Sequence, residues 1–215
     1  MFIRKLKEQR ELETKVIANQ IETQEAERRK IAIDLHDDLG STLSVLKEQI
    51  FKETTDPQTQ RLIHKAIDDL RSISHNLLPV DFEAFGLVAS LEKHIRQLND
   101  IGLKITFIVF GEQHTFPNLI ALNLYRILVE ILHNFKKHSP SKEATVQLIY
   151  HAEFLHVAVE CSDVVEKKDD IGNGIGQKSI ISRLEYLHAR VLEKGESTNG
   201  YSYIFEIQYD QNLDS

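Results

Sequence analysis

The chain has 215 residues, with 33 acidic and 26 basic side chains, a formal net charge of −7 and one cysteine. This length allows one large or two small domains, and the acidic balance argues against a general nucleic-acid binder. A single cysteine excludes an internal disulfide and fits a reducing cytosol, so we expect a cytoplasmic protein. No apolar run approaches the roughly 18 residues that span a bilayer, so we expect no membrane segment within the chain.

The first part of the chain is predicted to be one long helix over residues 5–53, because it is highly charged and lacks proline. Its beginning, residues 1–25, has only a sparse apolar stripe, which is compatible with a leader helix or a weak coiled coil. Residues 54–57 predict a turn, with Asp56 as the N-cap of the next helix. This second helix is expected to end near Pro79.

Both predicted helices carry an apolar stripe at helical spacing. The stripe residues are Ile31, Leu35, Leu39, Leu43, Leu46 and Ile50 in the first helix, and Ile63, Ala66, Ile67, Leu70, Ile73 and Leu77 in the second. A hairpin of two such helices cannot bury both stripes by itself, whereas two hairpins can bury them in a four-helix bundle. We therefore expect a homodimer.

After a connection at residues 79–86 the pattern changes to helices alternating with mainly antiparallel strands. Helices are predicted over residues 87–98 and 117–137 and in a segment that ends near 188, and strands over residues 104–110, 145–150 and 155–161, near 191, and over 203–207. This order predicts an α+β sandwich for the rest of the chain.

The string from Glu27 to Gly40 contains a histidine that is followed by a carboxylate. His36 comes one residue after Leu35, about 100° round the helix axis from the stripe. Its ring is therefore expected at the flank of the packed face, where it stays accessible. Asp37 can fix the ring tautomer and leave the other nitrogen free as a nucleophile. A single histidine on a helix is also often only a solvated side chain or a cap.

A second group of polar residues lies in the predicted helix over residues 117–137. Glu130, Asn134 and Lys137 occupy positions i, i+4 and i+7, so they share one stripe of this helix. A carboxylate, an amide oxygen and an ammonium suit Mg²⁺ with a triphosphate, because hard oxygen atoms bind the ion and the cation meets phosphate. An ordinary solvated helix face can have the same composition.

A glycine-rich loop, residues 172–176, opens the next helix. Glycines let the backbone approach a phosphate group, and the free N–H groups at a helix start attract it. A glycine cluster alone indicates no more than a flexible loop.

These segments resemble, in the same order, motifs of the sensor histidine kinases that have a short two-helix dimerisation domain. Residues 27–40 resemble the phosphoacceptor box, residues 130–138 the N box, and residues 172–176 with Ser182-Arg183-Leu184 the second glycine box. The resemblance covers residues 26–207, and the first two boxes are its most specific parts.

The resemblance implies an α+β protein in which a two-helix hairpin forms a dimeric four-helix bundle and is followed by an α/β sandwich of the histidine-kinase ATPase type. After a leader helix over residues 1–25, residues 26–80 would be the dimerisation and phosphoacceptor domain and residues 84–210 the catalytic domain. His36 would be autophosphorylated from Mg-ATP, with Asp37 as general base. The phosphoryl group would then pass to an aspartate of a response-regulator receiver domain.

The resemblance also implies roles for the N box. Asn134 would bind Mg²⁺, Glu130 would position water or assist proton transfer, and Lys137 or His138 would contact phosphate. The residues expected to bind ATP are Asn134, Lys137, His138, Asp163, Gly174 and Gly176.

One motif of the family is altered in this chain. Active members have an Asp-x-Gly-x-Gly box after the third strand, and its Asp holds the adenine amino group. Matched in register, Cys161 replaces this Asp, and the alternation along residues 155–161 predicts that Cys161 faces the core. A shift of two residues lets Asp163 take the role, yet Val164 and Val165 deprive the loop of its glycines. Loss of one charged hydrogen bond would weaken nucleotide binding about 10- to 150-fold.

Two other interpretations stay open. The chain could be an ATP-independent histidine phosphotransfer protein or pseudokinase scaffold with a dead nucleotide site, or a helical dimerisation module without phosphate chemistry. Many relatives also place Gln or His four residues after the carboxylate that corresponds to Asp37, for phosphatase action. This chain has Ser41 there, which argues against a phosphatase role.

Overall fold

The computed structural model describes residues 2–53, 56–77, 80–139, 142–161, 175–197 and 200–209. The chain separates into two compact units: a helical unit, residues 18–84, and an α+β unit, residues 85–215 with residues 1–17. The domain boundaries expected from the sequence, 26–80 and 84–210, stay predictions.

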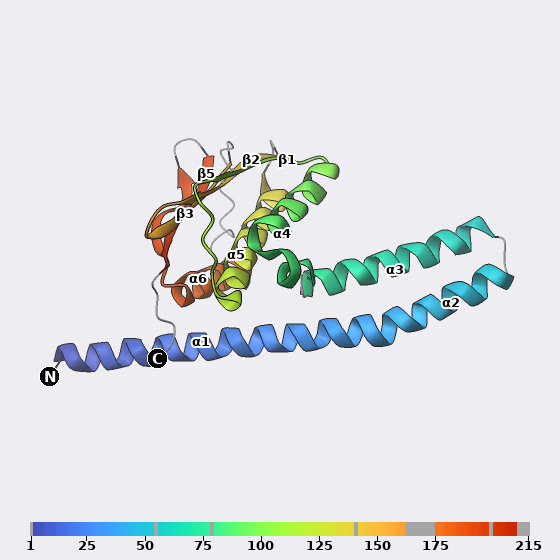
Figure 1. Cartoon of the computed structure of the whole chain (residues 1–215), viewed down its shortest axis with the longest axis horizontal. Helices are drawn as coiled ribbons and strands as arrows, with labels where there is room; N and C mark the ends of the chain where they lie inside the picture. Colours follow the sequence, from blue (N-terminus) through green and yellow to red (C-terminus); the bar gives the residue numbers. More distant parts are fainter. Residues whose placement is uncertain are drawn as a thin grey trace. The chain divides into compact units, whose positions relative to one another are not determined.

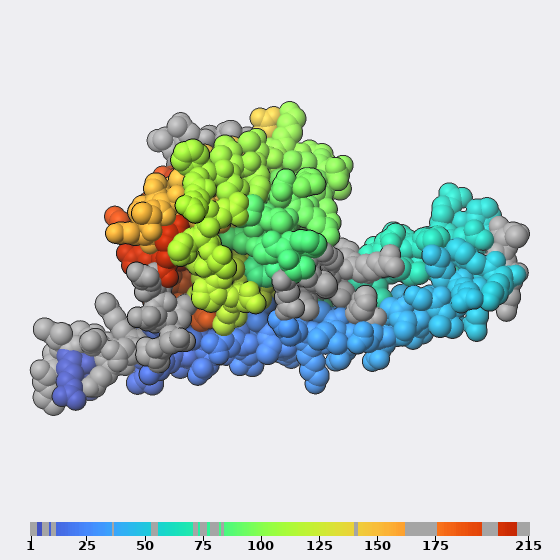
Figure 2. Space-filling model, viewed as in Figure 1, coloured from blue at the N-terminus to red at the C-terminus, as the bar shows by residue number. Residues whose placement is uncertain are grey.

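The helical unit contains an antiparallel hairpin. Its elements are α1 (Phe2–Asp34), which begins before the unit, the π-helical segment η1 (Leu35–Leu39), α2 (Gly40–Glu53) and α3 (Pro57–Leu77). Helix α3 returns alongside α2 and η1 (Figure 1), and Figure 2 shows the residues of α2 lying against those of α3. Across the hairpin the rings of Phe51 and His64 contact each other, with their centroids 5.3 Å apart.

The start of α3 is capped by Asp56, as predicted. The Asp56 carboxylate accepts hydrogen bonds from the backbone N–H groups of Gln58, at 3.2 Å, and Thr59, at 3.0 Å. The Thr59 hydroxyl donates a third bond, at 2.6 Å. These bonds favour the ionised carboxylate, so they lower the pKa of Asp56, and the bond from the Thr59 hydroxyl is the largest cause.

We expect Asp56→Ala to lower the thermal midpoint of unfolding at neutral pH, because the first turn of α3 loses its acceptor. The lowered pKa makes this stabilisation depend on pH. It is complete above the ordinary aspartate pKa of the unfolded chain, and it is lost as the pH falls through the lower folded-state pKa. Circular dichroism melts of wild type and Asp56→Ala should therefore converge in acid, whereas the control Asp56→Asn keeps a neutral acceptor. If the difference in thermal midpoint between wild type and Asp56→Ala stays constant down to acid pH, the ionised Asp56 cap is not its cause.

The hairpin leaves part of each predicted apolar stripe uncovered. The half-buried stripe residues are Leu35, Leu43, Ile50, Ile63, Ile67, Leu70 and Leu77. The exposed stripe residues are Ile31, Leu39, Leu46, Ala66 and Ile73. We call these five exposed residues the open face of the hairpin; within it the side chains of Leu46 and Ile73 are 41% and 53% exposed.

The remaining elements form the helices and sheet of the α+β unit. They are α4 (Val80–Asp100), whose first five residues still belong to the helical unit, β1 (Lys104–Phe110), α5 (Asn118–His138), β2 (Glu143–Tyr150), β3 (Phe154–Cys161), α6 (Ile175–Tyr186), β4 (Arg190–Ser197) and β5 (Gly200–Gln208). The strand order is β1-β2-β3-β5-β4; β1 and β2 are parallel, and every other neighbouring pair is antiparallel. The predicted α+β class and the mainly antiparallel sheet are confirmed.

Helix α4 begins earlier than the sequence predicts. Residues 80–86 were expected to be a connection, yet the helix starts at Val80 and is interrupted only at Gly86. Gly86 has φ 73° and ψ −170°, a conformation that costs a glycine little because it has no Cβ.

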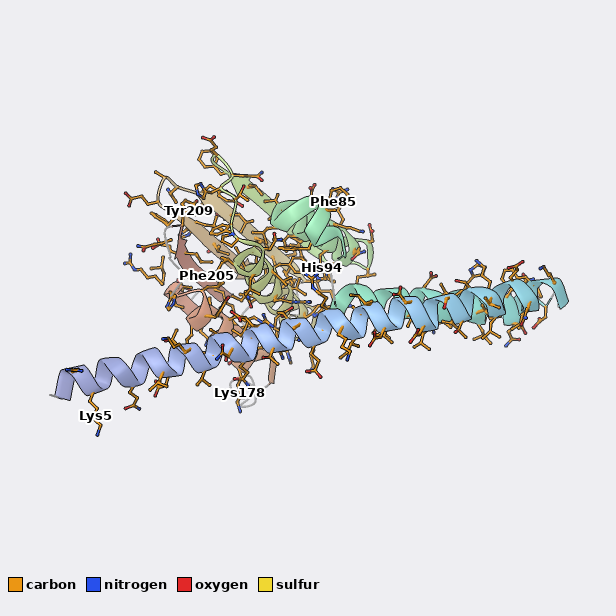
Figure 3. The ribbon with its side chains drawn as sticks, turned by 60° about the horizontal axis from the view of Figure 1, so that its bottom comes forward. Lys5, Phe85, His94, Lys178, Phe205 and Tyr209 are labelled. Carbon is orange, nitrogen blue, oxygen red and sulfur yellow. The ribbon has the colours of Figure 1, made fainter. Side chains whose placement is uncertain are left out.

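Helices α4, α5 and α6 cover one face of the sheet, which gives this unit two layers (Figure 1). Parallel neighbours such as β1 and β2 need a crossover connection, and α5 supplies it. The core lies between the layers: Leu124 and Leu128 of α5 are fully buried, and Phe205 of β5, labelled in Figure 3, is 1% exposed. Cys161 is 6% exposed, so the prediction that it faces the core is confirmed. None of the helices that the structure describes has the length and hydropathy that a bilayer crossing requires.

Candidate functional site

The polar stripe predicted from the sequence lies on the second half of α5. Because α5 is helical throughout, Glu130, Asn134 and Lys137 share one face. Glu130 and Asn134 are half-buried, whereas Lys137 and His138 are exposed in the last turn. Basic residues in a last helical turn also offset the negative end of the helix dipole, which gives Lys137 and His138 a structural reason to be there.

The first turn of α6 packs directly against this stripe. A Cβ built on Gly176 would overlap Oε1 of Glu130 and would lie 3.0 Å from its Cδ. Glycine therefore lets α6 pack this close without displacing the Glu130 carboxylate, which is the end of a flexible side chain. The contact is also electrostatically favourable, because the N–H groups of a first helical turn have no partners within the helix. The structure thus brings a residue of the N box together with a residue of the second glycine box.

A histidine pair lies beside the stripe. His133 follows Glu130 by three residues on α5, and its ring centroid is 5.5 Å from that of His94 of α4, which Figure 3 labels. Burial lowers the pKa of His133, the Glu130 carboxylate raises it, and Lys136 lowers it further. Burial of the ring is the largest of these effects, so the pKa of His133 lies below its ordinary value.

Sequence reasoning missed a buried polar contact between α5 and α6. Asn123 is 0% exposed and Arg183 is 2% exposed, and Nη1 of Arg183 donates a hydrogen bond to Oδ1 of Asn123. The only signal in the sequence is that Asn123 interrupts an otherwise apolar run seven residues before Glu130. Arg183 was noted as part of the second glycine box, without a role of its own.

The phosphoacceptor candidate lies in the helical unit, in η1. The N–H of Gly40 donates to the carbonyl of Leu35, five residues back, which makes this turn π-helical and interrupts the single regular helix predicted over residues 5–53. π-turns inside α-helices are frequent at functional sites. The structure describes the backbone of His36 and not its side chain; the Asp37 side chain is exposed.

Hydroxyl groups follow this π-helical turn directly. Ser41 donates to the carbonyl of Asp37, and Thr42 donates to the carbonyl of Asp38 at 2.7 Å. These bonds give the backbone carbonyls of η1 side-chain donors where the π-helix returns to an α-helix. The Ser41 hydroxyl therefore has backbone partners of its own.

The altered adenine box is described only at its first residue. Cys161 is the last residue of β3, paired with Ala144 of β2 and Tyr201 of β5, and its thiol is buried. Asp163 and Gly174 lie outside the described residues.

The donor set on α5 fits Mg²⁺ better than a transition metal. In the described part of the chain, no three His, Cys, Asp or Glu side chains form a group that could hold a metal ion. Glu130 and Asn134 instead offer two oxygen donors one helical turn apart. Mg²⁺ usually keeps several waters and binds through one or two protein oxygens together with substrate phosphates. The pair therefore fits an Mg²⁺ ion that is bound together with a nucleotide.

No protein-family model matches the chain, but curated proteins do. The chain is 23% identical over 207 residues to the signal transduction histidine-protein kinase/phosphatase DegS of Brevibacillus brevis, covering 87% of this chain and 52% of DegS. It is 24% identical over 214 residues to the oxygen sensor histidine kinase NreB of Staphylococcus carnosus (strain TM300), covering 94% of this chain and 62% of NreB. The chain thus spans less than two thirds of either relative.

Solved structures share the fold. The histidine kinase domain of the blue-light activated histidine kinase from Erythrobacter litoralis EL346 superimposes with a TM-score of 0.52 at 18% identity, over 90% of this chain and 94% of that one. A second structure of the same kinase gives a TM-score of 0.50 at 20% identity, over 74% of this chain and 64% of that one. The chain is therefore similar in sequence to proteins named as sensor histidine kinases, and it has the α+β fold of a histidine kinase domain.

Proposed function

We propose that this protein is a histidine kinase transmitter, which phosphorylates His36 from Mg·ATP and passes the phosphoryl group to an aspartate of a response-regulator receiver domain. The observation that carries the proposal is the contact of Glu130 with Gly176, with Asn134 one turn further along α5. This contact joins oxygen donors suited to Mg²⁺ with a helix start suited to phosphate. The relatives named as histidine kinases support it.

In this proposal His36 is the nucleophile. The lone pair of Nε2 forms a bond to the γ-phosphorus of ATP while the bond from that phosphorus to the bridging oxygen breaks, and ADP leaves. Asp37 accepts the proton that Nδ1 loses, and before that it orients the ring through the same N–H. The product is a phosphohistidine with no excess proton on its ring.

The α+β unit would hold the nucleotide. Asn134 would bind Mg²⁺, which neutralises charge on the phosphates. Glu130 would position water or assist proton transfer, and Lys137 or His138 would pair with phosphate oxygens. The backbone at Gly176 would present its N–H toward the phosphates.

We infer further that two copies of the chain pair through their helical units. The open face of the hairpin consists of apolar side chains that a single copy leaves uncovered. Two open faces brought together would form the core of a four-helix bundle.

Asn134→Ala is expected to weaken Mg·ATP binding at least about tenfold, because the ion loses a protein oxygen ligand. Isothermal titration calorimetry of the full chain measures this affinity directly. Asn118→Ala is the matched control, since Asn118 is an exposed asparagine at the other end of α5. Chelation of Mg²⁺ should weaken ATP binding to wild type more than to Asn134→Ala. Equal affinity of wild type and Asn134→Ala for Mg·ATP would exclude Asn134 as a ligand.

The buried thiol of Cys161 favours a second candidate function. Cys161 lies where the histidine kinases that the chain resembles have the adenine-binding Asp, and its side chain faces the core. A chain without that carboxylate could act as a histidine phosphotransfer protein, which receives its phosphoryl group from one receiver domain and gives it to another. The test incubates the chain, without ATP, with receiver domains that were phosphorylated beforehand with labelled acetyl phosphate. Label on wild type and none on His36→Ala would support this function, and an unlabelled wild type would oppose it.

A further inference from the structure

The buried contact between Arg183 and Asn123 connects α6 to α5 away from the proposed nucleotide site. The Arg183 guanidinium donates from Nη1 to Asn123 and from Nε to the Ser179 hydroxyl, the latter at 3.4 Å. Nδ2 of Asn123 in turn donates to the carbonyl of Leu119 at 2.8 Å. A buried guanidinium is costly unless its hydrogen bonds are made, so this contact strongly favours one arrangement of the two helices.

The spacing of this contact matches that of the contact at the site. Asn123 and Glu130 are seven residues apart on α5 (130 − 123 = 7), and Gly176 and Arg183 are seven residues apart on α6 (183 − 176 = 7). Seven residues are about two helical turns, so both members of each pair lie on the same helix face. The two helices therefore meet at two matched points, Arg183 with Asn123 and Gly176 with Glu130.

A slip between the helices would destroy the second contact. Moving α6 by one residue shifts it by about 1.5 Å and turns its face by about 100°. Ile175 or Gln177 would then face Glu130 in place of Gly176, and the Cβ of either residue would push the Glu130 carboxylate out of its position.

We propose that Arg183 is a positioning residue: through Asn123 it sets the register of α6 on α5 and so holds Gly176 against Glu130. The inference rests on the proposed function, because Glu130 and Gly176 belong to the proposed nucleotide site. Its structural part, the register of α6, can be measured without any nucleotide.

Arg183→Met removes the hydrogen-bond donors and keeps an apolar side chain of similar length. We expect amide hydrogen exchange over residues 179–184 of α6, whose N–H groups bond within the helix, to become at least about tenfold faster in nucleotide-free Arg183→Met, with exchange of β3 unchanged. Mg·ATP affinity should fall at least about tenfold. Asn123→Ala removes the acceptor from the other side of the same contact, so it should change both measurements in the same direction as Arg183→Met. If Arg183→Met does not fold, Arg183→Lys, which keeps the charge and one donor group, takes its place.

Ile180→Val is the control for a purely structural loss, since Ile180 is fully buried on the same helix. It should destabilise the protein without changing the affinity for Mg·ATP. If Arg183→Met behaves like Ile180→Val, with exchange raised evenly over α6 and β3 and with unchanged affinity, the proposal is overturned. If wild type itself binds no Mg·ATP, the proposed kinase function fails, and the exchange measurement alone decides whether Arg183 sets the register.

Discussion

Gly176→Ala is expected to weaken Mg·ATP binding at least about tenfold. The added methyl group would overlap the carboxylate of Glu130, so either α6 or the Glu130 side chain must move. Oε1 of Glu130 is the far end of a flexible side chain, so the carboxylate can turn away at little cost to the fold and loses its place at the proposed nucleotide site. Loss of one hydrogen bond of a charged group costs about 1.5–3 kcal/mol, which is a factor of ten or more in affinity. Because the displaced groups belong to the proposed nucleotide site, calorimetric titration with Mg·ATP should detect the change as a loss of affinity.

Two further variants make this result specific. Gly102→Ala is the control, because Gly102 also belongs to the α+β unit, has φ +98°, and has no atom within 4 Å of an added Cβ. It should lower stability through its backbone and leave the affinity for Mg·ATP unchanged. Shortening the acid in Glu130→Asp/Gly176→Ala makes room for the methyl group, so part of the affinity should return. Wild-type affinity in Gly176→Ala would show that the contact plays no part in nucleotide binding.

Leu46→Glu is expected to turn the proposed dimer into a monomer. Leu46 belongs to the open face of the hairpin, and the proposed bundle would bury it in both copies. Leaving one buried charge uncompensated costs about 3–5 kcal/mol, so two should raise the dimer dissociation constant at least about 100-fold. Sedimentation equilibrium over a range of protein concentrations measures this constant.

The matched control for this variant lies on the sheet. Ile108 of β1 is 42% exposed and Leu46 is 41% exposed, so the two substitutions change similar amounts of apolar surface. Ile108→Glu should leave the dissociation constant unchanged. A monomeric wild type, or equal association of wild type and Leu46→Glu, would mean that the open face of the hairpin is not the dimer interface.

Elements with strong local patterns were predictable from the sequence. The alternation of Leu155, Val157, Val159 and Cys161 predicts a strand with one buried face, and all four side chains are buried. The Asp56 cap was predictable for the same reason, because a cap is a contact between residues two and three positions apart.

The π-helical turn at His36 was not predictable from the sequence. The Gly40 N–H donates to the carbonyl five residues back in place of four, and the helical pattern of apolar residues barely distinguishes these two choices. Residues 80–86 were misjudged for a related reason. Gly86 marks a break in the backbone, but its presence does not say whether the residues before it are helical.

The residues of the candidate site on α5 were predictable from the sequence, but their contacts with α6 were not. The spacing of Glu130, Asn134 and Lys137 fixes their common face, because all three lie on one helix. The packing of α6 on α5 determines the other two contacts, of Gly176 with Glu130 and of Arg183 with Asn123. Contacts between residues so far apart in the chain have no local sequence pattern from which they could be predicted.

Incubation of the purified full chain with γ-labelled Mg·ATP measures whether His36 is autophosphorylated. Phosphohistidine is labile in acid and stable in base, so the stability of the label identifies the modified side chain. We predict acid-labile label on wild type, none on His36→Ala, and strongly reduced label on Asn134→Ala. No label on wild type at millimolar ATP, or label that persists in His36→Ala, would exclude autophosphorylation of His36.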